Sequence, residues 1–85
     1  MELKLSENIK SLRIKKNLTQ KELALALAVS PQTVSRWEKG GAFPDVLMLE
    51  KLASFFGITI DALVGRGAEY VAGLRRQLSN SITKV

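Results

Sequence analysis

The chain has 85 residues, of which 46% are hydrophobic and 25% are charged. This length and composition predict one small folded domain and argue against both a disordered chain and a two-domain protein. There is no cysteine, so neither a disulfide nor a thiolate zinc site can stabilise the fold. We find no signal peptide and no apolar run long enough to span a membrane, so a cytoplasmic location is expected.

The net charge of +5 is unevenly distributed along the chain. Residues 1–40 hold eight Lys or Arg against four Glu, which gives +4. Residues 41–65 hold one Lys against three acidic residues (−2), and residues 66–85 hold four basic residues against one Glu (+3). A basic face opposite a mildly acidic one suits a polyanion such as DNA. The pattern alone is not specific, because many small basic domains bind no nucleic acid.

The first predicted helix covers residues 6–16, because Ile9 and Leu12 are spaced to share one helical face. Ser6 is the expected N-cap of this helix. Asn17 suits the left-handed conformation that often ends a helix.

The second predicted helix starts at Gln20, because residues 19–22 (TQKE) match the capping box. The following alternation of Leu and Ala formally fits a half-buried strand. However, Ala and Leu favour helices, and the capping box already sets a helical start. In that helix Leu23 and Leu27 share the buried face, whereas Leu25 points elsewhere and should be exposed.

A corner at residues 28–30 precedes the third predicted helix. Ser30 is a favourable N-cap, and Pro31 suits the first helical position because a missing N–H costs nothing there. This helix is expected to reach Lys39 and to stop at Gly40.

The third helix has an apolar face and a polar face. Val34 and Trp37 lie three residues apart and should face the core. The opposite side carries Gln32, Thr33, Arg36 and Lys39, with Ser35 at the edge. Polar residues on an exposed helix are usually only solvated. Their position after a capped helix and a three-residue corner instead predicts a helix-turn-helix at about residues 20–39.

Two further helices complete an all-α domain that we assign to residues 5–65. Asp45 caps the fourth, which ends at Gly57, and Thr59 caps a short fifth helix. The fourth helix is expected to bury a stripe formed by Val46, Leu49, Leu52, Ala53 and Phe56. Residues 66–85 are assigned to a tail, either a linker or a weak helix.

The outward row of the third helix offers the chemistry that reads base edges. Gln can bond bidentately to adenine and Arg to guanine, and the methyl group of Thr can contact that of thymine. Gln32, Thr33 and Arg36 are therefore the candidate base-reading residues. The candidates for phosphate contacts are Gln20, Lys39, Lys16 and Ser35.

Three segments together resemble the Cro/repressor family of helix-turn-helix domains, found in lambdoid phage repressors and many bacterial regulators. They are LTQKELA at 18–24, VSPQTVSRWEKG at 29–40 and FPDVLMLEKLASFFGITIDAL at 43–63. The resemblance implies a compact five-helix domain that binds double-stranded operator DNA as a homodimer. It also implies that Gln20 contacts a phosphate, and that the base-reading face is the one identified above.

The same resemblance implies roles for residues outside the recognition helix. It pairs Arg13 with Glu38 in an ion pair between the first and third helices. It places dimer contacts around the fifth helix, where Phe55, Ile60 and Val64 are candidates, although ordinary core packing explains each equally well. The family usually has Gly at the corner where this chain has Ala28.

The sequence supports a DNA-binding transcriptional regulator, with a repressor as the expected type. The alternative is an antitoxin-type regulator whose main partner is a protein toxin. That partner would bind the exposed Leu25 and Leu47 and a tail stripe formed by Val71, Leu74 and Leu78. An enzyme is not expected, because there is no His, no Cys and no carboxylate cluster spaced for acid–base or metal chemistry. We therefore expect neither a cofactor nor a metal.

Overall fold

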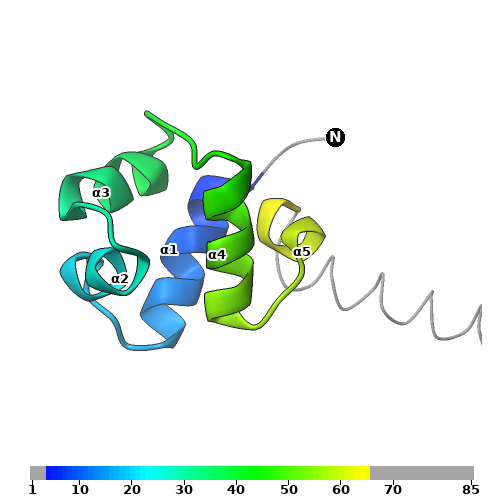
Figure 1. Ribbon diagram of the computed structural model, residues 1–85, viewed down its shortest axis with the longest axis horizontal. Helices are drawn as coiled ribbons and strands as arrows, with labels where there is room; N and C mark the ends of the chain where they lie inside the picture. The colour runs from blue at the N-terminus through cyan, green and yellow to red at the C-terminus, as the bar shows by residue number, and fades with distance from the viewer. Residues whose placement is uncertain (1–3, 66–85) are drawn as a thin grey trace, which may run out of the picture.

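A computed structural model describes residues 4–65, which form five α-helices and no strand (Figure 1). The helices are α1 (Leu5–Lys15), α2 (Gln20–Leu27), α3 (Pro31–Lys39), α4 (Val46–Phe56) and α5 (Ile60–Val64). The all-α, five-helix prediction is confirmed. The tail stripe at Val71, Leu74 and Leu78 lies outside the described residues, so the division into a domain and a tail stays a prediction.

Side-chain caps begin four of the five helices where the sequence predicted them. In α2 the backbone N–H of Glu22 donates to Thr19 Oγ1 (3.0 Å), and the Thr19 N–H donates to Glu22 Oε1 (2.9 Å). The other three caps are Ser30, Asp45 and Thr59, and each accepts a backbone N–H from three residues further along. Each cap satisfies an N–H that would otherwise have no partner within the helix.

The start of α1 differs from the prediction. The helix begins at Leu5 rather than Ser6, and Lys4 is an N-cap whose side chain makes no capping hydrogen bond. A tertiary contact sets this start, because the Lys4 backbone N–H donates to the carbonyl oxygen of Val64 (3.2 Å) at the end of α5. Leu5 is buried, so including it in the helix extends the apolar stripe of α1 into the core.

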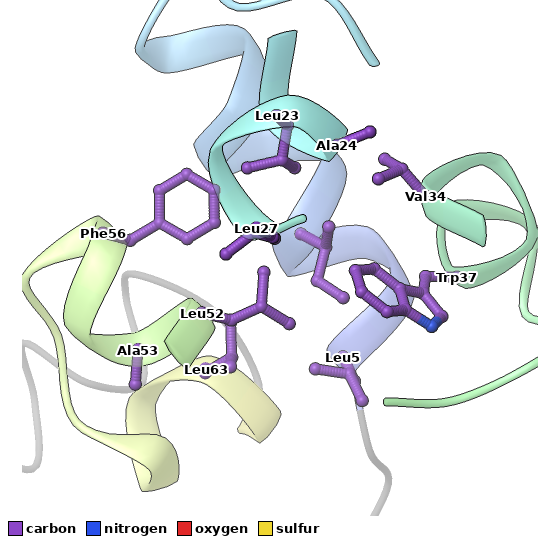
Figure 2. Close-up of a cluster of buried hydrophobic side chains, with 11 residues drawn as sticks. Leu5, Leu23, Ala24, Leu27, Val34, Trp37, Leu52, Ala53, Phe56 and Leu63 are labelled. Carbon is purple, nitrogen blue, oxygen red and sulfur yellow. The ribbon is translucent and has the colours of Figure 1, made fainter. Parts of the chain in front are cut away.

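The core receives one fully buried residue from every helix. These residues are Ile9, Leu23, Val34, Leu52 and Leu63. Figure 2 shows four of them pointing toward one another: Leu23, Val34, Leu52 and Leu63. In the same view Trp37 of α3 extends toward Leu5 of α1. Figure 1 shows α2 and α3 at one end of the domain and α5 at the other, with α1 and α4 between them. The packing thus fixes the orientation of α3 relative to α1 and α2.

One predicted core position is wrong. Val46 is 69% exposed, whereas Leu49 is half-buried and Leu52 is fully buried. Burial therefore increases from Val46 to Leu52, and Val46, the first residue of the helix, lies beyond the part that the other helices cover.

The corner has a left-handed conformation at the position where the family usually has Gly. Ala28 has φ 58° and ψ 41°, and Asn17 at the end of α1 has φ 58°. The Val29 N–H donates to the Ala24 carbonyl oxygen (3.0 Å), which closes the end of α2. Because a Cβ is disfavoured in this region, Ala28 stores local strain of about 1 kcal/mol.

Within residues 4–65, no helix has the length and apolar character needed to cross a membrane.

Candidate nucleic-acid interface

The polar face of α3 is open to solvent, and its apolar face is buried. Gln32, Arg36 and Lys39 are exposed, while Val34 and Trp37 on the opposite side belong to the core. Thr33 and Ser35, at the margins of the exposed face, are half-buried. The three long polar side chains therefore form one row on a helix whose other face is fixed by packing.

Thr33 also belongs to the cap of α3. Its backbone N–H donates to Ser30 Oγ (3.1 Å), and its Oγ1 lies 2.9 Å from the same oxygen. The hydroxyl of Thr33 is thus engaged within the domain, which leaves its methyl group as the part available for an apolar contact.

The first N–H groups of α2 and α3 are available to an anion. In α2, those of Gln20 and Lys21 have no acceptor among the described residues. In α3, Pro31 has no N–H, and the described part of the chain likewise provides no acceptor for the N–H of Gln32. Such groups, together with the positive end of the helix dipole, can bind a phosphate.

A single carboxylate connects three helices behind this surface. Glu38 of α3 accepts hydrogen bonds from Arg13 of α1, at 2.7 Å from Nε to Oε2 and 3.1 Å from Nη2 to Oε1. Arg13 Nη1 also donates to the carbonyl oxygen of Leu18 (2.8 Å), in the turn before α2. The structure thus contains the ion pair that the resemblance implied, with side-chain exposures of 13% for Arg13 and 3% for Glu38.

The third hydrogen bond to Glu38 was not foreseen from the sequence. Gln20 Nε2, at the first position of α2, donates to Glu38 Oε1 (3.1 Å). Nothing in the spacing of these two residues signals this contact, because it depends on the angle between α2 and α3. The hydrogen bonds and charge of Glu38 outweigh the effect of burial and raise the pKa of Arg13. The guanidinium therefore stays charged at any pH near neutrality.

Lys16 lies against α4. Its Nζ is 5.0 Å from the centroid of the Phe55 ring, within the range of a cation–π interaction. Phe55 in turn meets the ring of Phe56 edge to face, with centroids 5.2 Å apart. This contact gives Lys16 a structural partner, and its role toward phosphate stays a prediction.

The three candidate dimer residues share one kind of environment. Phe55, Ile60 and Val64 are each half-buried and pack against the edge of the core. They contribute to the fold and still present part of their apolar surface to solvent. The dimer contact at these residues stays a prediction.

Comparisons with known proteins agree with this geometry. A family model described as "Helix-turn-helix" matches residues 9–63. The chain is 34% identical over 83 residues to the HTH-type transcriptional activator BcrR of Enterococcus faecalis, covering 98% of this chain and 40% of that protein. It is 39% identical over 59 residues to the cryptic phage CTXphi transcriptional repressor RstR of Vibrio cholerae, covering 69% of this chain and 53% of that protein.

A solved structure adds the comparison of the fold. The P22 c2 repressor, crystallised in complex with a synthetic operator, superposes with a TM-score of 0.69 and 26% identity, covering 75% of this chain and 96% of that one. The chain therefore belongs to the helix-turn-helix family, and the two curated relatives named above are described as transcription regulators. This confirms the resemblance identified from the sequence. The chain spans about half or less of the length of the two curated relatives named above.

Proposed function

We propose that this protein acts in the cytoplasm as a homodimer that binds operator DNA, with α3 of each copy in the major groove. The observation that carries the proposal is the exposed row of Gln32, Arg36 and Lys39, on a helix whose opposite face is locked into the core. A helix-turn-helix reads DNA with such a face at its second helix. Repression is the mode of action that we expect from the resemblance to phage repressors.

In this proposal three side chains of α3 read bases. Gln32 pairs with adenine, and Arg36 pairs with guanine, each through two hydrogen bonds worth about 1–3 kcal/mol of discrimination. The methyl group of Thr33 contacts thymine, which fits the engagement of its hydroxyl by Ser30.

The proposed phosphate contacts surround these residues. The backbone N–H groups at the start of α2, which have no acceptor among residues 4–65, support a contact at Gln20. Lys39 is exposed at the end of α3 and supplies a charge. Ser35 and Lys16 complete the proposed set, with Lys16 reaching DNA from its position beside Phe55.

The proposed dimer uses the exposed parts of Phe55, Ile60 and Val64. Their position at the edge of the core supports a two-fold contact without rearrangement of the fold. Two copies related in this way would present their recognition helices about 34 Å apart to a nearly palindromic operator.

A protein partner is the second candidate function, and it corresponds to the antitoxin-type alternative. The observation that favours it is the exposure of Leu25 (83%) and Leu47 (72%). Leu47 also lines a groove of about 650 Å³ between α2 and α4, together with Ala26, Ala28 and Phe55. Coexpression with neighbouring genes tests this candidate. A stable complex that Leu47→Asp abolishes would support it, whereas operator binding with no such complex would count against it.

Selection from random duplex DNA tests the main proposal. The full chain should enrich two related half-sites whose centres lie about one helical turn apart, because each copy reads one major-groove face. Enrichment of an isolated half-site would reject the dimer and keep base reading. Uniform recovery of all sequences would reject sequence-specific function.

A further inference from the structure

We infer that Glu38 positions the phosphate-binding end of α2 by holding the side chain of Gln20. This inference rests on the proposed function, because it assigns Gln20 a contact with DNA. Its structural basis is the hydrogen bond from Gln20 Nε2 to Glu38 Oε1 (3.1 Å). Glu38 itself is almost completely buried, so it acts on DNA through Gln20 and not by direct contact.

The chemistry of the pair fixes the orientation of the Gln20 amide. An ionised carboxylate only accepts hydrogen bonds, so the nitrogen of the amide, and not its oxygen, must face Glu38. That nitrogen carries two hydrogens, and Glu38 uses one. The second has no acceptor among residues 4–65, and the same holds for the backbone N–H groups of Gln20 and Lys21 at this end of α2. The start of α2 thus carries several donors that an anion could use.

Holding the side chain in advance favours binding. A free glutamine side chain loses rotamer freedom when it contacts a phosphate, and this loss weakens the complex. Gln20 is half-buried and already hydrogen-bonded, so much of its ordering occurs when the protein folds. Donors that are preorganised in this way bind more tightly than the same donors on a mobile chain.

Arg13 makes a carboxylate tolerable near a phosphate. A buried negative charge beside the DNA backbone would repel it, but two hydrogen bonds from the Arg13 guanidinium offset the charge of Glu38. Arg13 makes no hydrogen bond to Gln20, and its remaining hydrogen bond goes to the Leu18 carbonyl oxygen. The two residues of the ion pair therefore have separable roles: Arg13 compensates charge and fixes the turn, and Glu38 orients Gln20.

This separation supplies a matched control. Glu38→Gln replaces the carboxylate by an amide with one acceptor for three donors, so Gln20 loses its partner in competition with the guanidinium. Arg13→Lys disturbs the same ion pair but leaves the carboxylate facing Gln20. Should Glu38→Gln fail to fold, Glu38→Asp serves instead, because it keeps the charge and withdraws the acceptor by one methylene. Gln20→Met removes the donor and preserves the length of the side chain.

The test is a double-mutant cycle in operator affinity, using the full chain and an operator obtained by selection. Gln20→Met should weaken binding about tenfold or more in the wild-type background, as expected for a hydrogen bond to a charged group. In the Glu38→Gln background, Gln20→Met should change operator affinity by less than about threefold. In the Arg13→Lys background, Gln20→Met should again lower operator affinity about tenfold. A purely structural clamp would lower stability in both backgrounds without changing the effect of Gln20→Met.

A second readout needs no DNA. In the NMR spectrum of the full chain, the side-chain amide of Gln20 should give one proton signal shifted downfield by Glu38. That shift should persist in Arg13→Lys and disappear in Glu38→Gln or Glu38→Asp. Its persistence in the Glu38 variants would overturn the inference.

The affinity results distinguish the inference from the proposed function. An equal effect of Gln20→Met in all backgrounds would overturn the positioning role and leave the phosphate contact intact. No effect in the wild type would overturn both the contact and the inference, while base reading by Gln32 could still be demonstrated. Failure to enrich any operator would overturn the proposed function and the inference with it.

Discussion

Replacing Glu38 by Ala should strongly destabilise the domain. The substitution removes a carboxylate that is 3% exposed and accepts hydrogen bonds from Arg13 and Gln20. It leaves the Arg13 guanidinium, 13% exposed, without its counter-ion. Breaking a buried ion pair by removing one partner costs about 3–5 kcal/mol. A domain of this size has a total stability of only about 3–9 kcal/mol, so a large part of it should be lost.

Urea unfolding of the full chain, followed by far-UV circular dichroism, measures this loss. The matched control is Glu50→Ala, because Glu50 is exposed on α4 and its loss should change stability by less than about 0.5 kcal/mol. The double variant with Arg13→Ala should cost less than the sum of the two single variants, since it leaves no unpaired charge. A loss below about 1 kcal/mol for Glu38→Ala, or strict additivity in the double variant, would refute this reasoning.

Two further substitutions test the corner and the phosphate contacts. Ala28→Gly should raise the free energy of unfolding by up to about 1 kcal/mol, because Ala28 has a positive φ. The control is Ala26→Gly, inside α2, which should lower the free energy of unfolding by a similar amount. A fall in melting temperature for Ala28→Gly would contradict the strain assigned to the corner. Lys39→Ala should weaken binding to all DNA sequences alike and reduce the slope of log K against log salt by about 1. Loss of affinity for the operator only, with an unchanged slope, would instead assign Lys39 to base reading.

Local signals in the sequence are sufficient to predict most of the fold. The caps at Thr19, Ser30, Asp45 and Thr59 depend on a few neighbouring residues, and the sequence predicts their positions. The alternating Leu and Ala run also became a helix, because its capping box and residue preferences outweighed a two-residue period.

The errors arose where contacts distant in sequence decide the outcome. α1 starts one residue early because Lys4 bonds to Val64, and Val46 is exposed because its stripe extends beyond the covering helices. For the candidate site, the exposed face of α3 followed from periodicity, but the bond from Gln20 to Glu38 did not. That bond depends on how α2 and α3 pack, which no motif in a single sequence specifies.

The central claim is that the exposed row of α3 reads bases, and a repeated operator selection with Gln32→Ala tests it most directly. The variant should keep the half-site spacing and the preference at other positions, but lose preference at one base pair in each half-site. Its affinity for the wild-type operator should fall by about 1–3 kcal/mol. An unchanged preference at every position, with equal weakening on random DNA, would contradict the claim and reduce Gln32 to a solvated surface residue.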